Sequence, residues 1–244
     1  MKALLLTLSL MLLSVAMVFG GLNVLMAASE IEGYQTTIVN ALSGFSDFDS
    51  VDWWNMQTLG QPDLSDIEAY DCVVTWSNYQ FPDATGWGNT LADYVDGGGR
   101  VVLGCFCWNS SWAIGGAILT SGYSPFTGNA GDHYSGASWE LTSPDIPGHP
   151  FLTDVDTVAC GYRDYVTLAA WGILVTHYQG DSEEALGVNE DNTVAAINVY
   201  PGQAGSPGYD WTGDVPQCMR NVIVDMCYTG IQPTSLGTVK AMFK

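Results

Sequence analysis

Basic side chains are scarce in this sequence. Its 244 residues contain only 6 Lys and Arg against 26 Asp and Glu, which gives a formal net charge of −20 at pH 7. A protein that binds nucleic acid neutralises backbone phosphates with Lys and Arg, so the composition argues against nucleic acid as a partner. Charged residues of either sign make up only 13% of the chain. Uncharged polar and aromatic side chains must therefore cover much of the surface, which suits an extracellular protein.

The sequence also contains only three histidines and lacks a glycine motif that would bind phosphate. The histidines, His133, His149 and His177, do not have the spacing of metal ligands, whereas catalytic zinc normally takes three protein ligands. The triple glycine Gly97–Gly99 follows a predicted helix instead of opening one, which disfavours a nucleotide or flavin. We therefore expect no cofactor. Calcium is the alternative left open, because three acidic stretches offer oxygen ligands: Asp154–Asp156, Asp181–Glu184 and Glu190–Asn192.

Only one long hydrophobic run is present, at the N-terminus. Lys2 precedes the largely apolar, uncharged stretch Ala3–Phe19, and Gly20 follows it. This pattern predicts a signal peptide over residues 1–20 and a secreted or cell-surface protein. The alternative is an uncleaved anchor, although 17 residues only just reach the length that crosses a bilayer. If the segment is cleaved, no stable membrane anchor is expected.

Six cysteines in an exported chain permit disulfides. Cys105 and Cys107 lie at the end of a predicted core strand, where a free cysteine would behave as a small hydrophobic residue. We expect at least one bridge, joining Cys105 or Cys107 to a distant partner such as Cys160.

The rest of the chain is organised around Tyr70–Trp108. Cys72–Trp76 is a short apolar run typical of a strand buried on both faces. Helical spacing follows and ends at the triple glycine, and Val101–Phe106 forms a second buried strand. Such a crossover unit builds doubly wound, mainly parallel α/β sheets, whose sites lie beyond the carboxyl ends of the strands.

The flanking segments extend this unit into one α/β domain over residues 21–230. Before it, the pattern predicts a strand at Leu22–Ala28, a helix capped by Ser29, and a strand at Val51–Met56. After it, the pattern predicts a helix at Trp112–Leu119, antiparallel hairpin strands in the C-terminal half and a closing helix at Asp214–Tyr228. The hairpin strands are Tyr165–Leu168, Gly172–His177 and Val194–Val199.

The segments YDCVV, LADYVDGGG and RVVLGCFCW, in this order, resemble the flavodoxin-like domain of the class I glutamine-amidotransferase superfamily, closest to its ThuA-like branch in secreted bacterial proteins. The resemblance implies a nucleophilic cysteine in a Gly-x-Cys turn and a later His-x-Glu. Cys105 is one residue short of that position after Gly104, and Cys107 is one residue beyond it. His177 is followed by Tyr178 and Gln179, so the motif is incomplete and an enzyme is not favoured.

Aromatic residues near the strand ends offer a second kind of site. Trp76, Tyr79, Trp108 and Trp112 could form a platform on which a sugar stacks, and the alternative is that they pack in the core or at its rim. Asn109 begins the only N-glycosylation sequon, Asn109-Ser110-Ser111. A glycan there would crowd the same crevice.

The last fourteen residues, IQPTSLGTVKAMFK, differ in character from the acidic body. They combine apolar and basic side chains without a carboxylate: Leu236, Val239, Lys240, Met242 and Phe243, with Lys244 at the end. Such a peptide is suited to docking onto a neighbouring copy, as an added strand or in a groove. It also resembles C-terminal sorting segments of exported bacterial proteins. Packing on its own domain is the third possibility.

These observations predict an exported, non-catalytic structural protein, a cell-surface or filament-forming subunit that associates with itself or with other surface components. The alternative is a secreted hydrolase or carbohydrate-binding domain that uses the crevice at the strand ends. Cys105 and His177 are the weak catalytic candidates for a hydrolase.

Overall fold

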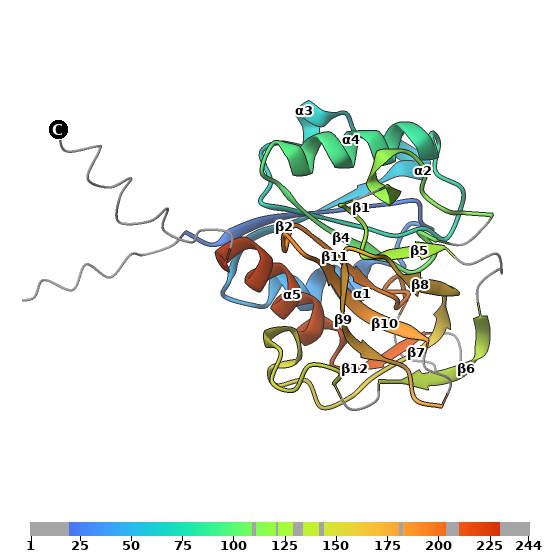
Figure 1. Cartoon of the computed structure of the whole chain (residues 1–244). Coiled ribbons are helices and arrows are strands. Elements are labelled where there is room, and N and C mark those ends of the chain that lie inside the picture. The colour runs from blue at the N-terminus through green and yellow to red at the C-terminus, as the bar shows by residue number, and fades with distance from the viewer. Residues whose placement is uncertain are drawn as a thin grey trace, which may run out of the picture.

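The computed structural model describes residues 20–108, 111–120, 122–128, 134–141, 144–180, 183–203 and 210–229. A seven-stranded sheet forms its centre, in the order β2-β1-β3-β4-β11-β10-β9 (Figure 1). The strands are β2 (Phe48–Asn55), β1 (Leu22–Ala28), β3 (Cys72–Thr75), β4 (Arg100–Gly104), β11 (Val194–Ile197), β10 (Glu184–Asn189) and β9 (Gly172–His177). The first five run parallel, and β10 and β9 are added antiparallel.

Helices cover both faces of this sheet. The helix α4 (Ala84–Asp96) and the short α3 (Leu64–Ile67) lie on one face, and α1 (Thr36–Ser43) and α5 (Val215–Thr229) lie on the other (Figure 1). Alternate residues of the parallel strands therefore enter two separate cores. Val73 packs on the α4 side and Val74 on the α5 side. This is why the strands read as continuous apolar runs.

Local sequence explains where α4 begins and ends. The side chain of Asp83 accepts a hydrogen bond from the backbone N–H of Gly86 and caps the first turn. Trp87, Leu91 and Tyr94 are buried against the sheet. Gly98 then adopts φ +103°, a left-handed conformation that ends the helix at low cost. The crossover unit predicted from Tyr70–Trp108 is therefore present.

The C-terminal half adds two smaller antiparallel sheets. One has the order β12-β7-β6 and the other pairs β5 with β8. Their bounds are β12 (Trp211–Gly213), β7 (Val158–Arg163), β6 (Tyr134–Glu140), β5 (Phe126–Gly128) and β8 (Val166–Leu168). The remaining elements are α2 (Met56–Leu59), η1 (Ala117–Leu119) and η2 (Pro150–Leu152). The predicted fold class, a doubly wound and mainly parallel sheet with antiparallel additions in this half, is confirmed.

Two predicted helices differ from the structure. Ser29 does not cap a helix: it bridges to Ser77, Gly33 has φ +100°, and α1 begins only at Thr36. The predicted helix at Trp112–Leu119 is reduced to the single 3-10 turn η1, because Gly116 at its start has φ +70°. Within the described residues, none of the helices is both long and apolar enough to cross a membrane.

Candidate functional site

Four parallel strands end at one edge of the sheet and place the residues that follow them around a cavity. β1, β3, β4 and β11 are neighbours, so their carboxyl ends lie together. The cavity has a volume of about 420 Å³, which is within the range of small-molecule sites. Doubly wound sheets bind their ligands at this edge.

Aromatic side chains form most of the cavity wall. They come from the strand ends and from the neighbouring loops and β7: Tyr34, Tyr79, Phe106, Trp112, Tyr162 and Tyr200. The ring centroid of Phe106 lies 5.1 Å from that of Trp112 and 5.5 Å from that of Tyr162, with interplanar angles of 80° and 71°. The rings of Tyr162 and Tyr200 meet at 87°. Phe106 and Tyr200 are more nearly aligned, at 34°. The wall therefore consists mainly of edge-to-face ring contacts and is not a flat platform.

A buried carboxylate lies directly behind this wall. Glu30 follows β1 and is 1% exposed. Its Oε2 accepts hydrogen bonds from the Trp76 indole (2.9 Å) and the Tyr200 hydroxyl (2.7 Å). Its Oε1 accepts from the Asn78 amide (2.8 Å) and the backbone N–H of Ile31 (2.7 Å). All four acceptor positions of the carboxylate are thus used, and they join the ends of β1, β3 and β11.

Tyr200 links this carboxylate to the cavity. Burial and the negative charge of Glu30 raise the pKa of the Tyr200 hydroxyl above its usual value, so the hydroxyl remains a donor. The Asn78 amide also donates to the Tyr200 oxygen (3.0 Å). Gly202 packs against the pair, because a Cβ at that position would lie 2.2 Å from Glu30 Oε2. The geometry of this corner therefore depends on a glycine.

Phe106 occupies the turn in which the family resemblance implies a nucleophile. It is the second residue after Gly104, and its backbone has φ +61°, which is uncommon for a bulky residue. Its side chain is 1% exposed and carries no group that could attack a substrate. The sharp turn after β4 is thus present, but a phenyl ring stands where a thiol would be needed.

The two neighbouring cysteines do not replace that nucleophile. Cys105 and Cys107 are fully buried, and burial raises the pKa of both thiols well above the usual value, with the negative charge of Asp164 adding to the effect. A nucleophilic cysteine needs the opposite shift, toward the thiolate. Cys105 packs in the α5-side core and Cys107 in the α4-side core.

His177 lies away from this turn. It is on β9, and two strands, β11 and β10, separate β9 from β4. With a strand spacing of about 4.8 Å, the separation is about 14 Å. His177 Nδ1 instead lies 2.7 Å from Asp145 Oδ2, at a partly exposed position. The structure therefore does not bring the two weak catalytic candidates, Cys105 and His177, together.

The four aromatic residues predicted as a platform are divided between wall and core. Tyr79 (43% exposed) and Trp112 line the cavity. Trp76 is fully buried behind it and donates to Glu30. Trp108 is buried in the α4-side core, where its indole donates to Ser124 Oγ. Half of the predicted set thus faces the cavity.

The predicted disulfide to Cys160 is wrong in this structure, because all six cysteines are free thiols. Cys160 instead pairs with the Tyr178 hydroxyl (3.2 Å), and burial raises the pKa of its thiol to about 11. The Cys227 thiol donates to the backbone carbonyl of Asp71 (3.7 Å).

The described ranges contain no group of three or more His, Cys, Asp or Glu side chains that could hold a metal ion. The predicted calcium ligands therefore do not converge in that part of the chain. Part of one acidic stretch, residues 181 and 182, lies outside it. The sequon residue Asn109 and the assembly residues of the C-terminal tail also lie outside the described residues.

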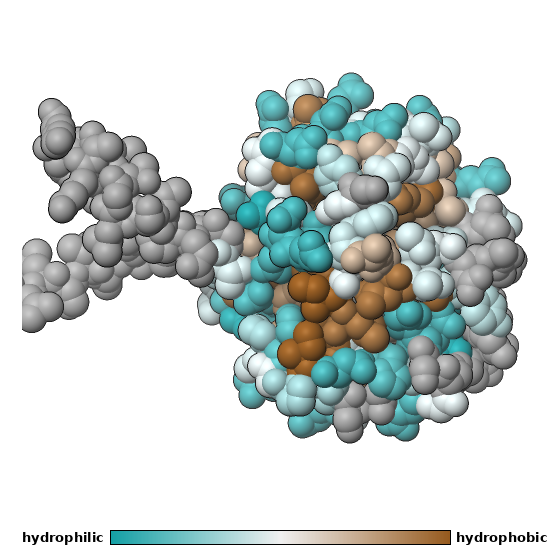
Figure 2. Space-filling view, in the orientation of Figure 1, coloured by the Kyte–Doolittle hydropathy of each residue, from teal (hydrophilic) through white to brown (hydrophobic). Residues whose placement is uncertain are grey.

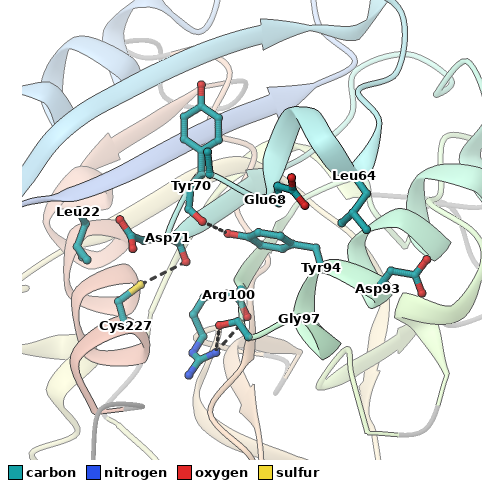
Figure 3. A pocket seen from close by; sticks show the side chains of 13 residues that line it. Leu22, Leu64, Glu68, Tyr70, Asp71, Asp93, Tyr94, Gly97, Arg100 and Cys227 are labelled. Carbon is teal, nitrogen blue, oxygen red and sulfur yellow. Dashed lines mark hydrogen bonds between the residues drawn. The ribbon is translucent and has the colours of Figure 1, made fainter.

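A second pocket, of about 880 Å³, lies at the opposite edge of the sheet, where β1, β3 and β4 begin (Figure 3). Three carboxylates line it: Glu68, Asp71 and Asp93. Arg100 is the one basic group among its described lining residues. It donates to the backbone carbonyls of Met226, Gly98 and Gly99. This pocket is larger than the first, but it lies at the edge that doubly wound sheets do not use for catalysis.

Sequence reasoning missed several residues of the aromatic cavity. Glu30 and Tyr200 directly follow strands whose ends the sequence located, so the rule about carboxyl ends could have found them. Tyr34 and Tyr162 carry no such signal, because the first was assigned to a helix face and the second lies in a strand, β7, that was not predicted. Phe106 carries no reactive group, so nothing in the sequence distinguishes it from an ordinary core residue.

Comparisons with known proteins support the fold. No protein-family model and no curated protein matches the sequence. Among solved structures, the cytoplasmic protein STM3548 from Salmonella typhimurium matches with a TM-score of 0.62 and 14% identity, over 83% of this chain and 98% of that one. A ThuA-like protein from Bacteroides uniformis matches with a TM-score of 0.54 and 10% identity, over 88% of this chain and 93% of that one. The cytoplasmic protein STM1381 from Salmonella typhimurium LT2 matches with a TM-score of 0.57 and 12% identity, over 85% of this chain and 98% of that one. The ThuA-like resemblance is thereby confirmed at the level of the fold.

Proposed function

We propose that this protein is an exported, non-catalytic binding protein that holds a small organic ligand in the aromatic cavity at the carboxyl edge of its sheet. The observation that carries the proposal is the cavity wall: six aromatic side chains meet at the ends of parallel strands, in front of the hydrogen-bonded Glu30. Aromatic faces bind sugars and cations alike through stacking and electrostatics. The cavity is therefore built to surround a ligand.

The turn after β4 supports binding without catalysis. Phe106 fills the position of the implied nucleophile, and the thiols of Cys105 and Cys107 are buried with raised pKa values. The hydrolase alternative needs an accessible, activated nucleophile. The ligand-binding alternative needs only the wall, which the described residues provide.

We expect Trp112→Ala to weaken ligand binding at least about tenfold, which corresponds to about 1.4 kcal/mol. Trp112 is partly exposed and lines the cavity, so its loss removes binding surface at modest cost to the fold. The measurement is isothermal titration calorimetry with a panel of glucose, N-acetylglucosamine and choline.

The matched control is Trp171→Ala, which removes a partly buried tryptophan that does not line the cavity. It should leave the affinity unchanged. Equal losses of affinity in the two variants would place the binding site elsewhere. If none of the three probes gives a heat of binding, the proposal is wrong.

A second candidate function, self-association as a structural subunit, is favoured by the edge of the sheet. β9 is the last strand of the seven-stranded sheet, and an apolar area lies over it (Figure 2). Ile173 on β9 is 37% exposed. Farther along the strand, the Val175 carbonyl already accepts hydrogen bonds from the backbone N–H groups of Asp145 and Ile146. An exposed apolar edge strand is a template for pairing with another chain. The acidic second pocket is close to the end of α5 and would attract a basic, apolar segment such as Ile231–Lys244.

Deleting Ile231–Lys244 should convert a self-associating protein into a monomer, as measured by light scattering and negative-stain electron microscopy. Ile173→Lys should weaken association through the β9 edge, because a charge at an edge strand opposes pairing. If the truncated protein polymerises like the full chain, the role proposed for the tail is wrong.

A further inference from the structure

The charge and shape of the aromatic cavity narrow the class of ligand. We propose that the cavity binds a small organic cation with an ammonium or quaternary ammonium group. The inference rests on the proposed function, since it names the ligand class of the same site.

The rings enclose a compact volume. Phe106 meets Trp112 at 80° and Tyr162 at 71°, and Tyr162 meets Tyr200 at 87°. Phe106 and Tyr200 meet at 34° and are only 1% and 4% exposed. The rings that a ligand can reach are therefore the more exposed ones, Tyr34, Tyr79, Trp112 and Tyr162, which come from different elements and offer a rounded group more than one face. A cation is attracted to each aromatic face because the face carries negative charge density. A box of this kind is suited to an ammonium head group.

Two carboxylates lie in the cavity wall or directly behind it. Asp210 lies in the wall and is 7% exposed. Glu30 lies one layer behind, bonded to the wall residues Asn78 and Tyr200. The four groups that donate to Glu30 are all uncharged: an indole, a phenol, an amide and a backbone N–H. These contacts satisfy its hydrogen-bonding positions but do not cancel its charge.

The described part of the cavity wall is acidic. Among the described residues that line the cavity there is no Lys or Arg, and the other polar members, Asn78 and Gln203, are neutral amides. The whole chain has a formal net charge of −20. An anionic ligand would be repelled, and a neutral ligand would gain nothing from this field. A cation would be attracted both at long range and in the site.

The test compares choline with 3,3-dimethylbutan-1-ol, which has the same shape with a carbon atom in place of the charged nitrogen. In calorimetric titrations of the full-length protein at low salt, choline should bind at least about tenfold more tightly, a difference of about 1.4 kcal/mol. Raising the salt concentration should weaken choline binding and leave the neutral analogue unaffected. Equal affinities, or tighter binding of the neutral compound, would overturn the inference.

Charge variants test which carboxylate contributes. Asp210→Asn should reduce choline affinity about fivefold or more, whereas Asp93→Asn, in the pocket at the opposite edge, should not change it. If Asp210→Asn fails to fold, the salt dependence with the native chain decides the question. Binding of glucose or N-acetylglucosamine that is lost in Trp112→Ala, without choline binding, would overturn the cation inference and leave the cavity as the ligand site. No binding of any probe would overturn both.

Discussion

Replacing Glu30 by alanine should lower the free energy of unfolding by about 3 to 5 kcal/mol, because the change leaves several buried donors without an acceptor and each such donor costs about 1–3 kcal/mol. The donors are the Trp76 indole, the Asn78 amide and the Tyr200 hydroxyl. Urea denaturation followed by circular dichroism measures the loss. Glu30→Gln should have an intermediate effect, because its side chain keeps one acceptor oxygen of the right shape.

The control for this prediction is Glu68→Ala, at an exposed position on the opposite edge of the sheet. A surface change of this kind should shift the free energy of unfolding by less than about 0.5 kcal/mol. If Glu30→Ala costs no more than Glu68→Ala, the carboxylate does not organise the carboxyl edge as described.

Phe106→Ala is expected to cost about 3 to 5 kcal/mol of stability and to abolish ligand binding, because the ring is buried and contacts three other rings of the cavity wall. Phe106→Gly removes the same ring but also relieves the positive φ of 61°. A non-glycine residue in the left-handed region costs about 1–2 kcal/mol. The glycine variant should therefore be the more stable of the two.

The comparison is controlled at Trp112, whose backbone is not in the positive-φ region. There the usual order should hold, with Trp112→Gly less stable than Trp112→Ala, because glycine gains more entropy on unfolding. Chemical denaturation of all four variants checks both orders. An alanine variant of Phe106 that is more stable than the glycine variant would contradict the strained turn.

The sequence was sufficient to locate the scaffold, because strands buried on both faces leave an unmistakable apolar pattern. The structure places β1 at Leu22–Ala28 and β9 at Gly172–His177, with the bounds that the pattern predicts. The short apolar run Glu184–Asn189 was not recognised as β10, because its glycine and flanking acidic residues resemble a loop. The predicted starts of two helices were also wrong, because Gly33 and Gly116 adopt positive φ angles that interrupt the helical backbone there.

The site was harder to predict than the scaffold for two physical reasons. A tryptophan at the end of a parallel strand can enter either core, and Trp108 enters the α4-side core while Trp76 enters the other. A single glutamate after a strand is usually solvated, so the rule about carboxyl ends places Glu30 at this edge but does not mark it as buried. Its role depends on Tyr200, which is 170 positions away in the chain.

The most direct test of a ligand site at the carboxyl edge is a two-dimensional ¹H–¹⁵N NMR spectrum of the tryptophan indoles during titration with choline and with N-acetylglucosamine. At least one probe should shift the indole signals of Trp112, in the wall, and of Trp76, which donates to Glu30. The signal of Trp171, which donates to the Ser124 carbonyl, should stay in place. Unchanged signals of Trp112 and Trp76 at saturating concentrations of both probes would contradict a ligand site at the carboxyl edge.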